Sequence, residues 1–340
     1  MKAHPEYYAL GHGSRASDPA RRYNHICLSS KELFHVTVAY ARTLFDHYKL
    51  DMMSAMPEDA FTHMCTCPLC AGKDTPERGI RGRLSDYVWN FVNRVARETA
   101  KTHPDKKVSC LAYGTYRKPP LHIDKFHPNV QVGIVGGRAP TANTSEQRVK
   151  IRELRQSWQE KTDNRLINFE NYPFTNRGHY LPSFVPHTNA ASINTIKDTF
   201  LGEDIWLSII HDLHEAAYNH FKVYFTARMY WGGKDRDIDT LLNDYYRLFY
   251  GPAEKPMKAF FAYCEKNWRQ MEKDRTKIRH ALRLFEAGRE KVNPNSVYGR
   301  RMTLISDYLE ALRKKAVQLK KEEARKNTPE LGFMRRAKGI

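Results

Sequence analysis

Features that would place the chain in several common protein classes are absent from its 340 residues. No apolar run approaches the ~20 residues that a membrane-spanning helix needs. The first seven residues lack the apolar stretch of a secretory signal. No Gly-x-Gly-x2-Gly, Walker or nucleophile-elbow motif occurs, so the sequence offers no nucleotide site. These absences predict a soluble protein without a membrane partner and leave its localisation open.

Acidic residues are scarce, with 38 Asp+Glu against 56 Lys+Arg and a formal net charge of +18. A basic excess favours phosphate contacts and hence nucleic acid. However, ten of the basic residues and only three acids lie in residues 313–340. The basic residues elsewhere are dispersed, which is typical of a solvated surface. We therefore expect no nucleic-acid partner. The 41% hydrophobic and 12% aromatic content excludes disorder throughout.

Short apolar runs alternate with amphipathic stretches over the first two thirds of the chain. The predicted strands are 25–28, 52–56, 108–113, 130–135, 165–169 and 205–210. The predicted helices between them are 31–48, 85–102, 145–162 and 190–200. From residue 215 the pattern is helical only, and the last predicted helix spans 296–326. This alternation predicts parallel βαβ units followed by a helical region.

Cysteine is rare, and three of the six cysteines form a C-x-C-x2-C cluster at Cys65, Cys67 and Cys70. Zinc prefers four tetrahedral nitrogen or sulfur ligands. Cys27 ends the predicted strand before the one that leads into the cluster, so it is a candidate fourth ligand, with His63 as the local competitor. The sequence favours a structural zinc ion, since a closed site has no open position. A disulfide with free thiols, and reduced buried cysteines, stay open.

Several motifs follow one another in a characteristic order along the chain. They are His4-Pro5-Glu6-Tyr7-Tyr8-Ala9-Leu10, the cysteine motif after Pro57-Glu58-Asp59, Leu111-Ala112-Tyr113 with Arg117-Lys118-Pro119-Pro120, His179-Tyr180-Leu181-Pro182, and Tyr250-Gly251-Pro252-Ala253. This series resembles a bacterial family, domain of unknown function 4838, which has a glycoside-hydrolase-like, α-glucuronidase-like barrel. The resemblance covers about residues 4–255.

The resemblance implies a partial TIM-type (β/α)8 barrel of about six βα units, followed by an all-helical C-terminal region. We expect an arm or loop at 1–25, the barrel portion at 26–255, and helices with a basic tail at 256–340. Family members usually carry a preceding domain and two earlier barrel strands, and they are often exported. The chain therefore looks truncated, with an open seam that a missing segment or a partner chain would close. It also has Trp231-Gly232-Gly233 where the family has Trp-Asp-Pro.

Carboxylates follow two of the predicted strands, as glycoside hydrolysis requires. Glu58 and Asp59 follow the strand that the resemblance makes the fourth of the barrel, and Glu170 follows the seventh. Many retaining barrel glycosidases place their acid and nucleophile after those two strands. We expect Glu170 and Asp59 to form the pair, with Asp212 as the alternative second carboxylate. Surface ion pairs or helix caps are the non-catalytic interpretation.

Aromatic and basic residues also lie near the predicted strand ends. The candidates for substrate binding are Tyr113, Tyr116, Arg117, Tyr172, His179, Tyr180 and His211. Aromatic rings stack on sugar faces, and arginine binds a carboxylate through two hydrogen bonds. The first hypothesis is hydrolysis of a glycosidic bond in a polysaccharide or oligosaccharide. The second is a non-catalytic carbohydrate-binding or assembly protein, and the third is polyanion binding through the basic tail. Whether the protein is an enzyme stays open.

Overall fold

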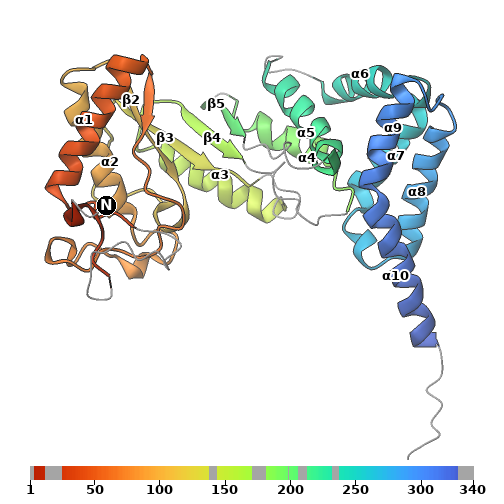
Figure 1. Cartoon of the computed structure of the whole chain (residues 1–340), viewed down its shortest axis with the longest axis horizontal. Coiled ribbons are helices and arrows are strands. Elements are labelled where there is room, and N and C mark those ends of the chain that lie inside the picture. Colours follow the sequence, from red (N-terminus) through yellow and green to blue (C-terminus); the bar gives the residue numbers. More distant parts are fainter. Residues whose placement is uncertain are drawn as a thin grey trace, which may run out of the picture. The chain divides into compact units, whose positions relative to one another are not determined.

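The computed structural model describes residues 4–11, 25–137, 144–170, 181–197, 199–205, 213–231 and 237–327. The chain divides into two compact units (Figure 1). The first unit contains the chain up to Glu170, apart from residues 139–141, together with Ile196–Ile205. The second unit contains the remaining segments. Within the described residues, no helix has the length and apolar character needed to cross a membrane.

Five parallel strands form one sheet in the first unit, in the same order as in the sequence. The strands are β1 (Met52–Ser54), β2 (Lys107–Ala112), β3 (Val130–Val135), β4 (Leu166–Glu170) and β5 (Phe200–Ile205). The sheet curls into a half-barrel and alternates with helices. The helices among the described residues of this unit are α1 (Lys31–Tyr48), α2 (Ser85–Ala100) and α3 (Ser145–Gln159). The predicted α/β fold with a partial barrel and a following helical region is thus confirmed.

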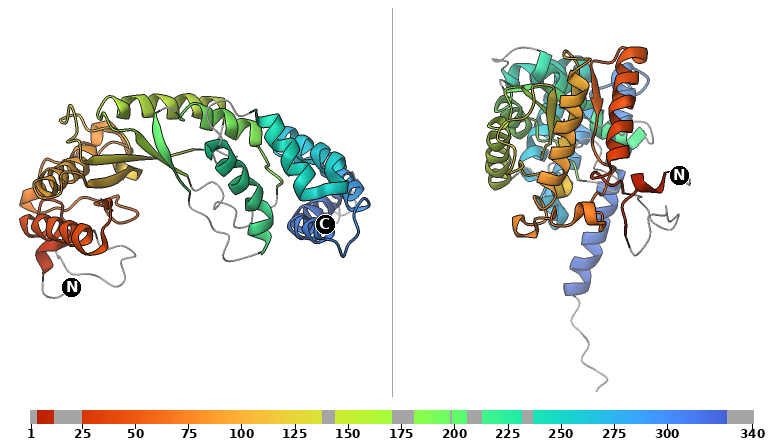
Figure 2. Two further views of the ribbon diagram at one scale, coloured as in Figure 1. Left: turned by 90° about the horizontal axis from the view of Figure 1, so that it is seen from above. Right: turned by 90° about the vertical axis from the view of Figure 1, so that its left-hand side faces the viewer.

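One face of the sheet is buried beneath helices. Along β2 every second residue is fully buried, and the central strand β3 is buried over its whole length. Ten of the sixteen residues of helix α2 are buried, including the fully buried Trp89, and the helix packs against β2 and β3. Helix α1 lies beside α2, as Figure 2 shows in the right-hand view. Ser30 caps α1 by accepting a hydrogen bond from Leu33 N, as the serines before Lys31 predict.

Two predicted strands differ from the structure. Residues 25–28 do not join the sheet, because Ile26 forms only an isolated antiparallel bridge with Tyr8. The last strand lies at Phe200–Ile205 instead of 205–210, of which residues 206–210 are outside the described part. Consequently the described sheet has five strands where the sequence predicts six. Helix α4 (Pro186–Asn194), which precedes β5 in sequence, also ends earlier than predicted.

The second unit is helical and has its own core. Its described helices are α4, α5 (Leu213–Trp231), α6 (Ile238–Tyr250), α7 (Glu254–Asn267), α8 (Arg275–Arg289), α9 (Val297–Tyr308) and α10 (Glu310–Asn327). Aromatic side chains fill the core, with Phe184 and Phe261 in direct ring contact. The single helix predicted at 296–326 is divided into α9 and α10. Beside the division, Tyr308 Oη donates a hydrogen bond to Leu181 O.

Candidate metal centre

The structure brings Cys27, Cys65, Cys67 and Cys70 together, with all four Sγ atoms within 4.8 Å of one another. All four side chains are buried, and none forms a disulfide. The Sγ atoms of Cys27, Cys67 and Cys70 are separated by 3.6, 3.7 and 3.8 Å. A zinc–sulfur bond of about 2.3 Å in tetrahedral geometry places neighbouring sulfurs about 3.8 Å apart, whereas a disulfide requires about 2.05 Å. The spacing is therefore too wide for a disulfide, and the four cysteines could hold a metal ion such as zinc.

Local backbone structure positions each sulfur. Pro68–Cys70 forms a short 3-10 helix, η2, in which Cys70 N donates to Cys67 O, so that Cys67 and Cys70 face the same point. Cys27 is held from the other side, because its N–H donates to Tyr7 O. Leu10 N donates to Cys65 Sγ at 3.1 Å. The cluster thus connects the N-terminal segment 4–11 to the loop that follows β1.

The electrostatics of the cluster favour one thiolate at Cys70. The hydrogen bond from Cys27 is the main reason that the pKa of Cys70 is lowered to about 4; Ser29 and Tyr87 contribute, while burial opposes the shift. The pKa of Cys27 is raised by its hydrogen bond to Cys70, by burial and by the charge of Cys70. Burial also raises the pKa of Cys65. A dication neutralises this mutual repulsion and allows all four sulfurs to ionise together.

Cys27 is thus the cysteine that completes the group, for a different reason from the one predicted. It does not follow a strand of the parallel sheet; it follows the antiparallel bridge between Ile26 and Tyr8. Among the described residues this is the one group of histidines, cysteines and carboxylates with metal-binding spacing, and His63 is not part of it. His63 Nδ1 instead lies 2.9 Å from Thr62 Oγ1.

Glu170 ends β4 and is only 1% exposed. Its Oε1 accepts hydrogen bonds from Gly137 N at 3.1 Å and from Asn168 Nδ2 at 3.3 Å. Asn168 lies on the same face of β4, and its Oδ1 accepts a hydrogen bond from Arg155 of α3. Glu170 therefore lies on the face of the sheet that α3 covers. A Cβ atom on Gly136 would overlap the Glu170 carboxylate, so a larger residue there would displace the Glu170 side chain.

The two other described carboxylate candidates lie on the loop after β1. Glu58 is half-buried, with its Oε1 2.9 Å from His25 Nδ1. Asp59 is exposed and accepts a hydrogen bond from Ala60 N. Neither makes a hydrogen bond or an ion pair with Glu170. Asp212 lies outside the described residues.

Of the predicted binding residues, three can be placed. Tyr116 is buried against Phe61, and burial raises its pKa. Tyr113 is partly buried directly after β2. Burial lowers the pKa of Arg117 to about 10, with Arg81 acting in the same direction and the charge of Glu170 opposing it. The remaining candidates, Tyr172, His179, Tyr180 and His211, lie outside the described residues.

Sequence reasoning missed the residues that surround the sulfurs. Tyr87 Oη lies 3.3 Å from Cys70 Sγ, and Ser29 Oγ lies 3.2 Å from it. Ser29 immediately follows the segment that carries Cys27, and Tyr87 lies on the first turn of α2. Ser29, two residues after Cys27, was the available signal in the sequence, but its contact with Cys70 Sγ depends on the tertiary fold.

The fold and the site define an α/β protein with a partial barrel, a helical region and a buried four-thiol cluster. The sequence matches the family described as "Domain of unknown function (DUF4838)" over residues 1–262. Since the match covers more than half of the chain, the protein belongs to this family. No curated protein and no solved structure gives a significant match.

Proposed function

We propose that Cys27, Cys65, Cys67 and Cys70 bind one structural zinc ion. The observation that carries this proposal is a buried group of four free cysteines whose Sγ atoms all lie within 4.8 Å of one another, with those of Cys27, Cys67 and Cys70 separated by 3.6–3.8 Å. Thiolates are the ligands that select zinc among the common divalent ions. Four protein ligands leave no open coordination position for a substrate, so the role of the ion is to stabilise structure.

The ion would stabilise the region between β1 and α2. That region, residues 55–84, contains only two short 3-10 helices, η2 and η3 (Pro76–Arg78), and is otherwise irregular. Cys65 and Leu10 connect it to the N-terminal segment, and Tyr87 connects the cluster to α2. Metal binding would therefore fix three separate parts of the first unit at one point.

Elemental analysis of protein purified without chelator tests this proposal, with about one zinc per chain as the expected result. Cys67→Ser should lose the metal and lower the thermal stability of the protein. Cys110→Ser is the matched control, because Cys110 is also a buried free cysteine but lies in β2 outside the cluster. The proposal is wrong if the unaltered protein carries little metal although its thiols are intact, or if both variants lose metal equally.

For the half-barrel we propose, as a second function, the binding of an oligosaccharide or polysaccharide. The resemblance to glycoside-hydrolase-like barrels supports it, because ligands of parallel α/β proteins bind at the carboxyl ends of the strands. Glu170 is at such an end, and its charge acts on the half-buried Arg117. The catalytic form of this proposal uses Glu170 and Asp59. The burial of Glu170 and its bonds to Gly137 and Asn168 favour the non-catalytic form.

A polysaccharide panel tested for both binding and release of reducing ends separates these forms. Binding without release supports the non-catalytic form. Release that Glu170→Gln abolishes, with binding and folding intact, supports hydrolysis. If neither binding nor release occurs with any polysaccharide, the carbohydrate proposal is wrong.

A further inference from the structure

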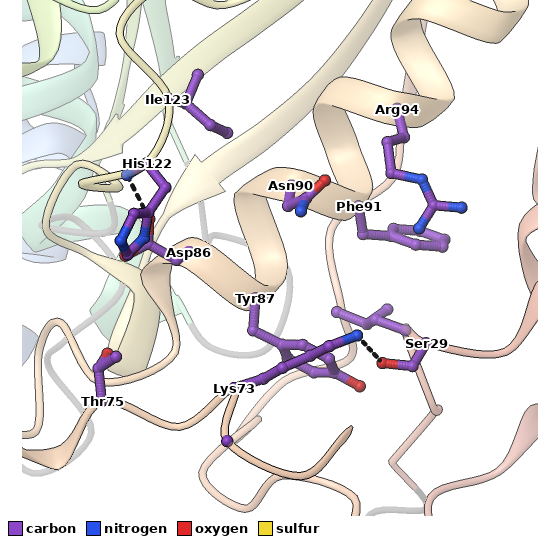
Figure 3. A pocket seen from close by; sticks show the side chains of 12 residues that line it. Ser29, Lys73, Thr75, Asp86, Tyr87, Asn90, Phe91, Arg94, His122 and Ile123 are labelled. Atoms are coloured by element: carbon purple, nitrogen blue, oxygen red, sulfur yellow. Dashed lines mark hydrogen bonds and ion pairs between the residues drawn. The ribbon is translucent and has the colours of Figure 1, made fainter. Parts of the chain in front are cut away.

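A cavity of about 290 Å³ lies beside the cysteine cluster in the first unit (Figure 3). Its walls come from the turn before α1, the loop after the cysteines, one face of α2 and the loop around His122. The lining residues that bear on its chemistry include Ser29, Lys73, Asp86, Tyr87, Phe91 and Arg94. Small-molecule sites have volumes of about 300–1,000 Å³, so this cavity fits a ligand at the small end of that range.

The cavity has more available positive than negative charge. Its one carboxylate, Asp86, is already engaged by Arg78 and by the backbone N–H groups of Leu121 and His122. Lys73 and Arg94 have no carboxylate partner among the residues that the structure describes. Lys73 Nζ donates to Ser29 Oγ at 2.9 Å. The Arg94 guanidinium lies 4.5 Å from the centre of the Phe34 ring, which leaves its N–H groups free to bind an anion.

Apolar and polar groups lie on different parts of the wall. Leu28 and Phe91 are buried and give the cavity an apolar floor. In Figure 3, Asn90 and Arg94 project from one face of α2, and Lys73 reaches toward Ser29 from the opposite loop. We propose that this cavity binds a small ring-bearing anion, with the ring against the apolar floor and its carboxylate or phosphate between Lys73 and Arg94.

The cavity shares its wall with the metal centre. Ser29 and Tyr87 both line it and both contact Cys70 Sγ. Gly72 and Lys73 lie two and three residues after Cys70, so the position of Lys73 depends on the loop that the cluster holds. This dependence rests on the zinc proposal, whereas the anion site itself rests on the cavity and its two cations.

Calorimetric titration of the zinc-loaded full chain tests the anion site. The probes are glucuronate and glucose 6-phosphate, which carry the two kinds of anion, neutral glucose, and inorganic phosphate without a ring. We expect at least one of the two sugar anions to bind, and to bind more tightly than glucose and inorganic phosphate. Its affinity should fall with added salt, because the cations are exposed at the rim. The proposed chemistry is wrong if glucose binds as tightly as the sugar anions, or if inorganic phosphate without a ring binds as tightly as they do.

Arg94→Gln should weaken binding of that anion about tenfold or more, since a charge-assisted hydrogen bond is lost. Arg97→Gln is the matched control, because Arg97 is an exposed arginine one turn further along α2 and does not line the cavity. Zinc content should be unchanged in both variants, which separates failure of the anion site from failure of the metal site. Equal affinity of the Arg94→Gln variant and the unaltered protein would overturn the assignment.

Discussion

The hydroxyl group of Tyr87 gives a direct test of the metal centre. Burial and the contact with Cys70 raise the pKa of Tyr87, so the phenol stays neutral. Its O–H group can therefore donate a hydrogen bond to Cys70 Sγ, 3.3 Å away. Side chains that form hydrogen bonds with the ligands of a metal ion typically raise the metal affinity by about 10–100-fold. Tyr87→Phe removes only this donor. We therefore expect its zinc affinity to fall by about 10–100-fold, or about 1.4–2.8 kcal/mol.

Competition with a chromophoric zinc chelator measures this difference. Tyr116→Phe is the control, because Tyr116 is also buried in the same unit and its hydroxyl has no hydrogen-bond partner among the described residues. Its zinc affinity should stay as it is in the unaltered protein. The reasoning is refuted if Tyr87→Phe binds zinc as tightly as the unaltered chain, or if both variants lose affinity equally.

Three further predictions follow from contacts in the two units. Gly136→Ala should lower the free energy of unfolding by about 1–3 kcal/mol, because its Cβ would overlap the Glu170 carboxylate. Urea denaturation measures this change. Gly137→Ala should have a much smaller effect, because a Cβ atom there meets nothing within 4 Å. Burial lowers the pKa of His187, but Glu265 and Asp239 outweigh burial and raise it above 6.5. This ion pair should stabilise the second unit fully below pH 6.5 and lose its effect as the pH rises through the raised pKa; thermal denaturation of His187→Gln across that range should lack this dependence. In hydrogen exchange, β3 should be protected more strongly than the edge strands β1 and β5, and equal protection of all three would show that another segment covers the edges.

The sequence predicts the regular parts of the first unit well, because their local patterns agree with their tertiary environment. Helix α1 and strand β3 have the predicted limits, since an N-cap serine and a continuous apolar run mark them. Residues 25–28 are apolar for another reason. Cys27 belongs to the cysteine cluster and Leu28 is buried next to it, so this segment has the apolar pattern of a short strand without pairing in the sheet.

Strand β5 is hard to predict because its sequence contains glycine and acidic residues. The acidic Glu203 is stabilised in the sheet because its Oε1 accepts a hydrogen bond from Asn168 Nδ2 of β4. No local pattern reveals such a cross-strand bond. The same limit applies to the candidate site. The C-x-C-x2-C spacing identifies three thiols, whereas the contacts of Tyr87 and Ser29 with Cys70 arise only when α2 and the turn before α1 are in place.

The irregular region between β1 and α2 explains why a metal ion would be useful at this position. Its thirty residues, 55–84, are more than most irregular loops contain, and ordering such a loop is entropically unfavourable. A metal bound at Cys65, Cys67 and Cys70 would divide the loop into two shorter segments, and shorter segments lose less entropy on closure. The second segment carries Lys73 and is further held by the ion pair between Asp74 and Arg83. This segment also forms one wall of the cavity. Removing the zinc ion should therefore disorder Lys73, whose ammonium group the proposed ligand needs. Metal and ligand would then bind cooperatively, with the metal stabilising the wall before the anion arrives.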